Sequence, residues 1–555
     1  MLDNLKEISM ETSKLLKSPS FLIALILLSF EFKLSNNERW AFLLFLLSFV
    51  WFKNARFKFH INWPLGAYFS FVASILYILF YVRPARAIQF LSYGYDNALH
   101  FTLFRGISET TWYPNVDLAN WFTDFQLFTN VPLGYYSLTS FLLHPFTLVV
   151  TDSISLASCY AIYQVFSAFI LMWLVFLTIR NPAQKNVQSR IFYAAMSSLI
   201  VVCLGSTLLV NGFPPYFFSL IIILIWLNFD SKNPVRWQKN LTLSLCIYSA
   251  SMLTPAPAIF LFLPASILIF QELMIFRKNS SVTELMLNLL PFAGIGALVL
   301  WSFADSSAGL GWRQLLQSGG LQNINLITSS LILTFTTWIL SRNRQKILND
   351  SLALLLISGL LSVVVLSSLT VAFTGNLQYY AIKQIYVLLF FASIYLVQNL
   401  DPLRIKIPAA GILGLLLLIP VLNPIFFTGG FMGVAPRVLA HTLNPEYWER
   451  EPVNAELIMN IKGLKNDKTN SCYIWRGKDG FTDLDLSSRW INSLKSTNLI
   501  SEKCFTSYWN NGGLSDLDLE KKLQGINNDF VILTESDNSL KNKNKIQYKI
   551  ISPKK

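Results

Sequence analysis

The sequence predicts an α-helical polytopic membrane protein of about thirteen transmembrane helices, followed by a small extracytoplasmic α/β domain. Of the 555 residues, 53% are hydrophobic and only 14% are charged, which excludes a soluble multidomain protein of ordinary composition. Lys and Arg occur in short clusters between apolar segments, where they set membrane orientation, so the net charge of +13 does not indicate a nucleic-acid partner. After residues 428–430 the composition becomes polar and aromatic, which marks the boundary of the second domain.

Residues 1–18 alternate charged and apolar side chains at helical spacing and lack the apolar core of a signal peptide. We expect them to form a cytoplasmic helix at the membrane interface. The transmembrane domain follows, over residues 19–427. Its predicted spans lie at about 19–34, 40–53, 66–82, 155–179, 190–210, 213–229, 241–254, 256–276, 284–302, 324–341, 351–373, 379–398 and 408–427.

The clusters of Lys and Arg predict the orientation, because such clusters are enriched in cytoplasmic loops. The cluster at 53–58 places the N-terminus inside, and the later clusters then fall on the same side. The run 131–150 would invert everything downstream if it crossed once. Pro132, Gly134 and Pro145 make it a poor continuous span, so we expect it to be re-entrant or interfacial. The outward side then collects the loops 83–154 and 303–323 and the C-terminal residues 428–555.

Helical and strand patterns alternate in the C-terminal residues 428–555, which predicts a small α/β domain. No nucleotide-binding glycine pattern and no zinc-ligand spacing occurs there. Cys472 and Cys504 are the two cysteines of this part, and a disulfide between them stays open. The clearest expected elements are strands at Cys472–Trp475 and Asp529–Leu533 and a helix at Ser487–Thr497.

Ionisable residues gather between residues 93 and 114, in the first large outward loop. If a helix begins here, the side chains of Asp96, His100 and Leu103 share one face at the i, i+4, i+7 spacing. Such a helix suits the membrane interface. It is either an interfacial connector whose charges stay in water or part of a catalytic loop, and the remainder of the chain favours the catalytic loop.

Lys383 is the exception in apolar segments that otherwise hold almost no charge. Ion-coupled carriers usually place ionisable groups near the membrane midplane and often contain repeats, so the scarcity of charge and the lack of a visible repeat argue against a carrier. Lys383 lies about one helical turn inside the outer end of its segment. Its ammonium either extends to the membrane surface or meets an anionic head group such as a lipid phosphate.

Taken together, these features resemble the GT-C class of integral-membrane glycosyltransferases, which take sugars from polyprenyl-phosphate lipids. The resemblance rests on Asp96 within Tyr-Gly-Tyr-Asp-Asn-Ala-Leu-His, on the aromatic remainder of that outward loop, on the many spans and on an outward C-terminal domain. The pattern Tyr379-Tyr380-x-x-Lys383 is similar to one in actinobacterial-type members that act on cell-envelope polymers. The resemblance implies a bacterial plasma-membrane enzyme with a polyprenyl-phosphate sugar as donor and an extracytoplasmic glycan, lipid or protein as acceptor.

By this resemblance Asp96 is the general base that accepts the proton of the acceptor hydroxyl. A partly desolvated carboxylate can have its pKa raised towards neutrality, which suits that role. Glu109 is the second catalytic candidate, followed by Asp117 and Asp124. The candidates for binding the phosphate are Arg105, Arg313 and Lys383, and His100 either binds the phosphate or orients Asp96. Tyr379 and Tyr380 are substrate-binding candidates from the family pattern. Trp112, Tyr113 and Trp121 either contact sugar rings or form a membrane-interface belt.

The paired Asp-x-Asp motif of the metal-dependent members is absent from this loop, so we expect no metal and no cofactor. The alternative is a divalent cation held by Asp96, His100 and Glu109, although hard cations prefer more carboxylates. Two other function classes stay open. A flippase or carrier for lipid-linked glycans would need a hydrophilic path through the central spans. A polymerase or ligase of the O-antigen type typically uses several arginines in its outward loops, which hold few here.

Overall fold

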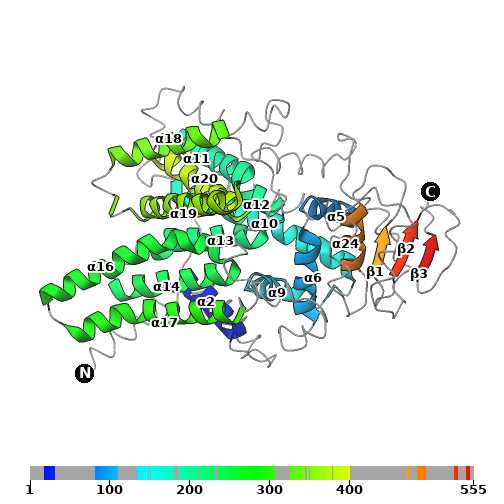
Figure 1. The fold of residues 1–555 in the computed structure, drawn as a ribbon, viewed down its shortest axis with the longest axis horizontal. Helices are drawn as coiled ribbons and strands as arrows, with labels where there is room; N and C mark the ends of the chain where they lie inside the picture. The colour runs from blue at the N-terminus through cyan, green and yellow to red at the C-terminus, as the bar shows by residue number, and fades with distance from the viewer. Residues whose placement is uncertain are drawn as a thin grey trace.

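The fold is known from a computed structural model, drawn in Figure 1. The structure describes residues 18–31, 82–94, 96–109, 134–147, 149–150, 152–179, 187–210, 212–231, 235–279, 281–306, 326–343, 347–348, 350–377, 379–399, 472–475, 484–494, 530–534 and 546–550.

Helices make up nearly all of the described residues before residue 400 (Figure 1). The first group comprises α2 (Pro19–Glu31), α5 (Pro84–Ser92), α6 (Asn97–Glu109), α9 (Gly134–Thr147), α10 (Ser153–Ile179), and α11 (Val187–Ile200), which continues through the π-helical η2 (Val201–Gly205) into α12 (Ser206–Val210). The second group comprises α13 (Pro214–Ile225), continued by the π-helical η3 (Trp226–Asp230), α14 (Arg236–Leu253), α15 (Pro255–Ala258), the 3₁₀ turn η4 (Ile259–Leu261), α16 (Phe262–Asn279), α17 (Val282–Ser306), α18 (Leu326–Arg342), α19 (Ser351–Thr374) and α20 (Tyr379–Asn399).

The predicted spans agree with these helices wherever the structure describes them. The spans predicted from 155–179 through 379–398 coincide with α10 to α20, and the span predicted at 19–34 coincides with α2. Among the described residues, five helical segments are long and apolar enough to cross a bilayer, which indicates a membrane-embedded helical protein: Ser153–Ile179, Phe192–Val210, Pro255–Lys278, Ser351–Thr374 and Tyr380–Asn399. Apart from Ser18 and Val82, the expected interfacial helix 1–18 and the spans expected at 40–53, 66–82 and 408–427 lie outside the described residues, so the number thirteen stays a prediction.

Helices that are apolar on every face form the centre of the helical part. Every residue of α13 from Pro214 to Leu224 is buried, as expected of a helix without a polar side. α20 packs against α18 and α19 and contributes the fully buried run Val387–Phe391. By contrast, α16, α17 and α19 expose large apolar side chains, among them Phe270, Leu290 and Val365. An extended apolar exterior is unfavourable in water and is the surface that lipid chains cover in a membrane.

Both ends of α19 are capped, and α20 follows its C-terminal cap. Asp350 caps α19, because its carboxylate accepts from the backbone N–H groups of Leu352 (3.0 Å) and Ala353 (3.2 Å). Gly375 ends α19 in the left-handed conformation at φ 75°, which glycine adopts without strain. α20 begins shortly afterwards, one turn before Lys383.

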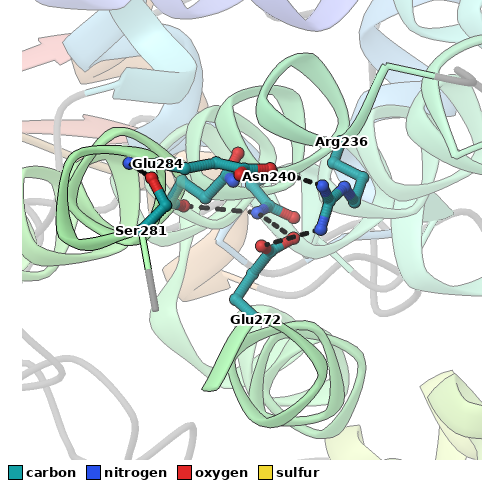
Figure 2. Close-up of polar contacts among 6 residues, drawn as sticks. Arg236, Asn240, Glu272, Ser281 and Glu284 are labelled. Carbon is teal, nitrogen blue, oxygen red and sulfur yellow. Dashed lines mark hydrogen bonds and ion pairs between the residues drawn. The ribbon is translucent and has the colours of Figure 1, made fainter. Parts of the chain in front are cut away.

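A polar network joins α14, α16 and α17 (Figure 2). The Arg236 guanidinium lies 2.5 Å from Glu284 and 3.5 Å from the buried Glu272, and Asn240 donates to the backbone carbonyl of Asn288 at 3.2 Å. Arg236 belongs to one of the clusters predicted to face the cytoplasm. Since it bridges two carboxylates, it contributes to helix packing as well as to the charge of that loop.

The run predicted to be re-entrant or interfacial contains α9. A helix of 14 residues is about 21 Å long, which is shorter than the hydrocarbon core of a bilayer, about 30 Å. Pro145 lies inside the helix, near its end, as the sequence suggested for a poor continuous span. The described α9 is thus shorter than a membrane-spanning helix, and the re-entrant placement of the run stays a prediction.

In the C-terminal part the structure describes three strands and one helix. Strands β1 (Cys472–Trp475), β2 (Phe530–Thr534) and β3 (Ile546–Ile550) form a parallel sheet in the order β1-β2-β3. Helix α24 (Leu484–Leu494) packs on β1, where Asn492 bonds both the backbone N–H (2.9 Å) and the carbonyl (2.8 Å) of Tyr473. β1 occupies the residues predicted for it and β2 is shifted by one residue, whereas β3 was not expected. A whole α/β domain over 428–555 stays a prediction, as does a Cys472–Cys504 bond, because Cys504 lies outside the described residues.

Candidate functional site

Two turns that are far apart in the sequence touch at the start of α6. A Cβ atom on Gly94 would lie 2.6 Å from the backbone nitrogen of Gly212, which is closer than real Cβ contacts allow. Gly212 itself has φ +84°, a conformation that favours glycine. Only glycine therefore lets the turn before α6 meet the turn before α13 so closely. This contact places the N-terminal ends of both helices side by side.

Asp96 stands immediately before α6. Its backbone carbonyl accepts from the N–H of His100 at 2.9 Å and so starts the helix. The side chain is half-buried, and its carboxylate interacts electrostatically with Tyr136 of α9 and with Tyr380 and Lys383 of α20. Asp96 is thus the point where three helices meet.

Both ring nitrogens of His100 have partners. Nε2 lies 3.0 Å from the carbonyl oxygen of Gly212 and Nδ1 lies 2.6 Å from the hydroxyl of Tyr136. A carbonyl oxygen only accepts, so Nε2 carries the proton, and the Tyr136 hydroxyl donates to Nδ1. The Tyr136 ring also stacks on the imidazole, with centroids 5.7 Å apart. His100 therefore ties α6 to α9 and to the Gly212 turn, and in this arrangement it leaves no ring nitrogen for the phosphate that the sequence suggested.

The environment of His100 favours the neutral imidazole. Burial lowers the pKa of His100 to about 4. The Asp96 carboxylate and the bond to the Gly212 carbonyl act against this shift, and the positive charge of Lys383 acts with it. His100 is therefore a neutral hydrogen-bonding group at ordinary pH.

A neutral His100 predicts that this residue accounts for part of the loss of stability of the protein in acid. Between pH 6.5 and about 4 the unfolded chain binds a proton at His100 that the folded protein does not bind, so the free energy of unfolding falls as the pH drops through this window, by up to about 3 kcal/mol. His100→Gln should remove this part of the pH dependence, measured as the midpoint of thermal unfolding in detergent from pH 4 to 7. His144→Gln on α9 is the control and should retain it. Equal slopes for the wild type and His100→Gln would contradict the assignment.

Lys383 points into the protein. Its side chain is only 5% exposed. Nζ lies 3.9 Å from the ring centre of Phe213, 4.9 Å from that of Tyr216 and 5.2 Å from that of Tyr380. Burying an ammonium costs free energy, and the three aromatic faces and the Asp96 carboxylate offset part of that cost. The ammonium does not extend to the membrane surface, which was one of the two interpretations of the sequence. We call Phe213, Tyr216 and Tyr380 the lysine cage.

Arg105 contacts the C-terminal part of the protein. Its guanidinium is 3% exposed and Nη1 donates to the backbone carbonyl of Ser493 in α24 at 3.0 Å. The sequence placed Arg105 among the phosphate ligands because it is a cation in an outward loop. The structure instead gives it a contact between α6 and the C-terminal part.

The structure brings together four of the predicted site residues: Asp96, His100, Tyr380 and Lys383. Leu103, expected on the same face, is buried. Glu109 ends α6 and Tyr379 begins α20, but their side chains lie outside the described part. The predicted residues that lie wholly outside it are Trp112, Tyr113, Asp117, Trp121, Asp124 and Arg313.

Sequence reasoning missed Gly212, Phe213, Tyr216 and Tyr136. The first three belong to an uncharged connection and to the helix after it, so no charged residue marks them as part of a site. The one usable signal was a glycine directly before an aromatic residue and two prolines, which marks a tight turn into a helix.

The cluster can bind an anion at Lys383 and accept a proton at Asp96, and it is built at the ends of α6, α13 and α20. Within the described residues, no group of three or more His, Cys, Asp or Glu side chains is placed to hold a metal ion; the side chain of Glu109 is outside that set. Comparison with models of protein families, with curated proteins and with solved structures finds no match to this chain.

Proposed function

We propose that the protein is a GT-C-type membrane glycosyltransferase. It moves a hexosyl or pentosyl unit from a polyprenyl-phosphate donor to an extracytoplasmic glycan, lipid or protein acceptor. The observation that carries this proposal is the interaction of the Asp96 carboxylate with the buried Lys383, two groups from helices far apart in the sequence. A carboxylate and an ammonium near enough to interact electrostatically are the two groups that transfer from a lipid phosphate needs.

In the proposed reaction the acceptor oxygen forms a bond to the anomeric carbon of the donor sugar, and the hydroxyl proton passes to Asp96. The bond from that carbon to the phosphate oxygen breaks, and its electron pair stays with the phosphate. Lys383 stabilises the polyprenyl phosphate as it leaves, because a charge-assisted contact strengthens as negative charge develops. His100 takes no proton in this scheme and keeps α6 in place.

The other predicted substrate contacts remain part of the proposal. Arg313 would add a second cation for the phosphate, and Trp112, Tyr113 and Trp121 would offer apolar faces to sugar rings. Glu109 is the alternative base. Arg105 donates to the backbone of α24, and its role as a phosphate ligand stays a prediction.

The proposed topology has thirteen crossings, a cytoplasmic N-terminus and an extracytoplasmic C-terminal α/β domain. A reporter fused after Lys555 and another inserted in the 303–323 loop should therefore both report the extracytoplasmic side. A cytoplasmic signal after Lys555 with an external signal in the loop would mean that the number of spans after 323 is wrong. Cytoplasmic signals at both positions would mean that 131–150 crosses the membrane.

The experiment that tests the activity is incubation of the purified protein, reconstituted in vesicles, with a panel of polyprenyl-phosphate sugars. Consumption of one sugar donor, with release of the polyprenyl phosphate, supports the proposal. Movement of an intact lipid-linked glycan between leaflets without cleavage would support the carrier instead. If no donor is cleaved in the presence of cell-envelope acceptors, the transferase proposal is wrong.

A further inference from the structure

Helix α24 packs against α6 through residues that directly adjoin the candidate site (Figure 1). The Trp490 ring, which is fully buried, stacks on Phe101 with centroids 6.0 Å apart. Ser493 Oγ lies 2.9 Å from the carbonyl oxygen of Ala98 and 2.9 Å from the hydroxyl of Thr102. These contacts join segments almost four hundred residues apart in the chain. They fix α24 along one face of α6.

The C-terminal end of α24 is capped by the helices that surround the site. The last carbonyl groups of a helix lack partners within it and carry a partial negative charge. Arg105 of α6 donates to the carbonyl of Ser493 at 3.0 Å, and Ser153 at the start of α10 donates to the carbonyl of Leu494 at 2.5 Å. A buried guanidinium at this end is favourable, because it meets both the carbonyl oxygens and the helix dipole. The α24 end is thus bonded from two sides.

The same short helix α6 carries the candidate site on its other side. His100 lies between Ala98 and Phe101 in the chain, yet its ring faces Tyr136 and the Gly212 turn. Helix α6 therefore lies between α24 on one side and α9 and the Gly212 turn before α13 on the other. Hydrogen bonds to Ala98 and from Arg105 fix its register, so it cannot slide or rotate without breaking bonds at both surfaces.

We propose that α24 positions α6 and, through it, Asp96 and His100, with Trp490, Ser493 and Arg105 as the positioning residues. The inference concerns the placement of two side chains, and it does not depend on what the cluster does. Its effect on sugar transfer rests on the proposed function. Since a misplacement of about 1 Å can cost about a hundredfold in rate, loss of this contact should be visible in both placement and transfer.

The placement of His100 can be measured without any substrate. The chain contains only four histidines, so nitrogen-15 NMR of histidine-labelled protein in vesicles gives few signals, and the signal missing in His100→Gln assigns His100. In the wild type we expect the Nε2–H form, with a titration midpoint of about 4. In the double variant Thr102→Val/Ser493→Ala, and in the single variant Trp490→Leu, we expect the His100 signal to change and its titration midpoint to shift towards 6.5.

Matched controls separate positioning from a general loss of packing. Trp490→Phe keeps an aromatic ring on Phe101 and should preserve the wild-type signal. Ser158→Ala on α10 removes a buried hydroxyl that bonds only its own helix, to the Ile154 carbonyl at 3.1 Å, and should also preserve it. Each variant is compared at equal helical content by circular dichroism. If Trp490→Leu or the double variant does not fold, Ser493→Ala alone decides the outcome.

The outcomes distinguish this inference from the proposed function. A changed His100 signal together with a loss of donor turnover of about tenfold or more supports both. A changed signal in a protein that transfers no sugar even in its wild-type form supports the positioning and overturns the function. An unchanged His100 signal in folded Ser493→Ala, Trp490→Leu and double variants overturns the positioning, whatever the activity.

Discussion

Asp96→Asn should lower the rate of sugar transfer by about 10²–10⁴-fold while donor binding stays close to that of the wild type. The amide keeps the volume of the side chain but cannot accept the proton of the acceptor hydroxyl. The bond from His100 N–H to the residue 96 carbonyl does not involve the side chain, so α6 should still begin at the same position. The measurement is single-turnover transfer from a radiolabelled donor, with donor affinity determined separately.

Two carboxamide variants serve as controls for Asp96→Asn. Asp152→Asn changes a carboxylate of the same loop that caps the following helix by accepting from Ser155 N–H at 3.0 Å, and Asn retains such a cap, so activity should persist. Glu109→Gln should cost less than Asp96→Asn if Asp96 is the base. If Glu109→Gln loses activity and Asp96→Asn does not, Glu109 is the base. If both retain activity, a carboxylate base in this loop is wrong and the carrier becomes the better hypothesis.

The helices matched to predicted spans were predictable because they are apolar runs separated by charge or proline. α13 is an example, since a continuous apolar run after Pro214-Pro215 leaves few alternatives to a buried helix. Strand β3 reads Ile-Gln-Tyr-Lys-Ile, an alternation of apolar and polar residues that is itself typical of a half-buried strand. The sequence therefore contained a signal for β3 that the prediction did not use.

The candidate site was predictable only in its parts. Asp96 and His100 share a helix at the i, i+4 spacing, and Lys383 is conspicuous as a charge in an apolar segment, so each could be found alone. Their meeting depends on the contact between Gly94 and Gly212. The sequence marks a tight turn at Gly212, but no pattern pairs that turn with Gly94. The lysine cage was also invisible, because Phe213 and Tyr216 are two among 44 Phe and 21 Tyr. The contact of Arg105 with α24 was unpredictable for the same reason: its partner is a backbone carbonyl, which no sequence pattern marks.

Lys383→Met should weaken donor binding by about 1.5–3 kcal/mol, or roughly 10- to 150-fold, because it removes one partner of a charge-assisted contact to the phosphate. Met keeps the length of the side chain and can fill the space between the rings of the lysine cage. Met also removes the positive charge that faces the half-buried Asp96 carboxylate, and loss of one partner of such a pair is destabilising, so the midpoint of thermal unfolding should fall. The loss of donor affinity, and not the loss of stability, therefore distinguishes a phosphate ligand from a purely structural lysine.

The measurements for Lys383→Met are binding of a polyprenyl-phosphate sugar to the protein in nanodiscs and thermal unfolding of the same sample. Lys239→Met changes a half-buried lysine of α14 and should leave donor affinity unchanged. Phe213→Leu tests the cage itself: it keeps the charge and removes the ring closest to Nζ, so it should weaken donor binding less than Lys383→Met does. Unchanged donor affinity in Lys383→Met would show that the ammonium does not bind the phosphate. A loss of stability together with unchanged affinity would assign Lys383 to packing, through its contacts with Asp96 and the three rings.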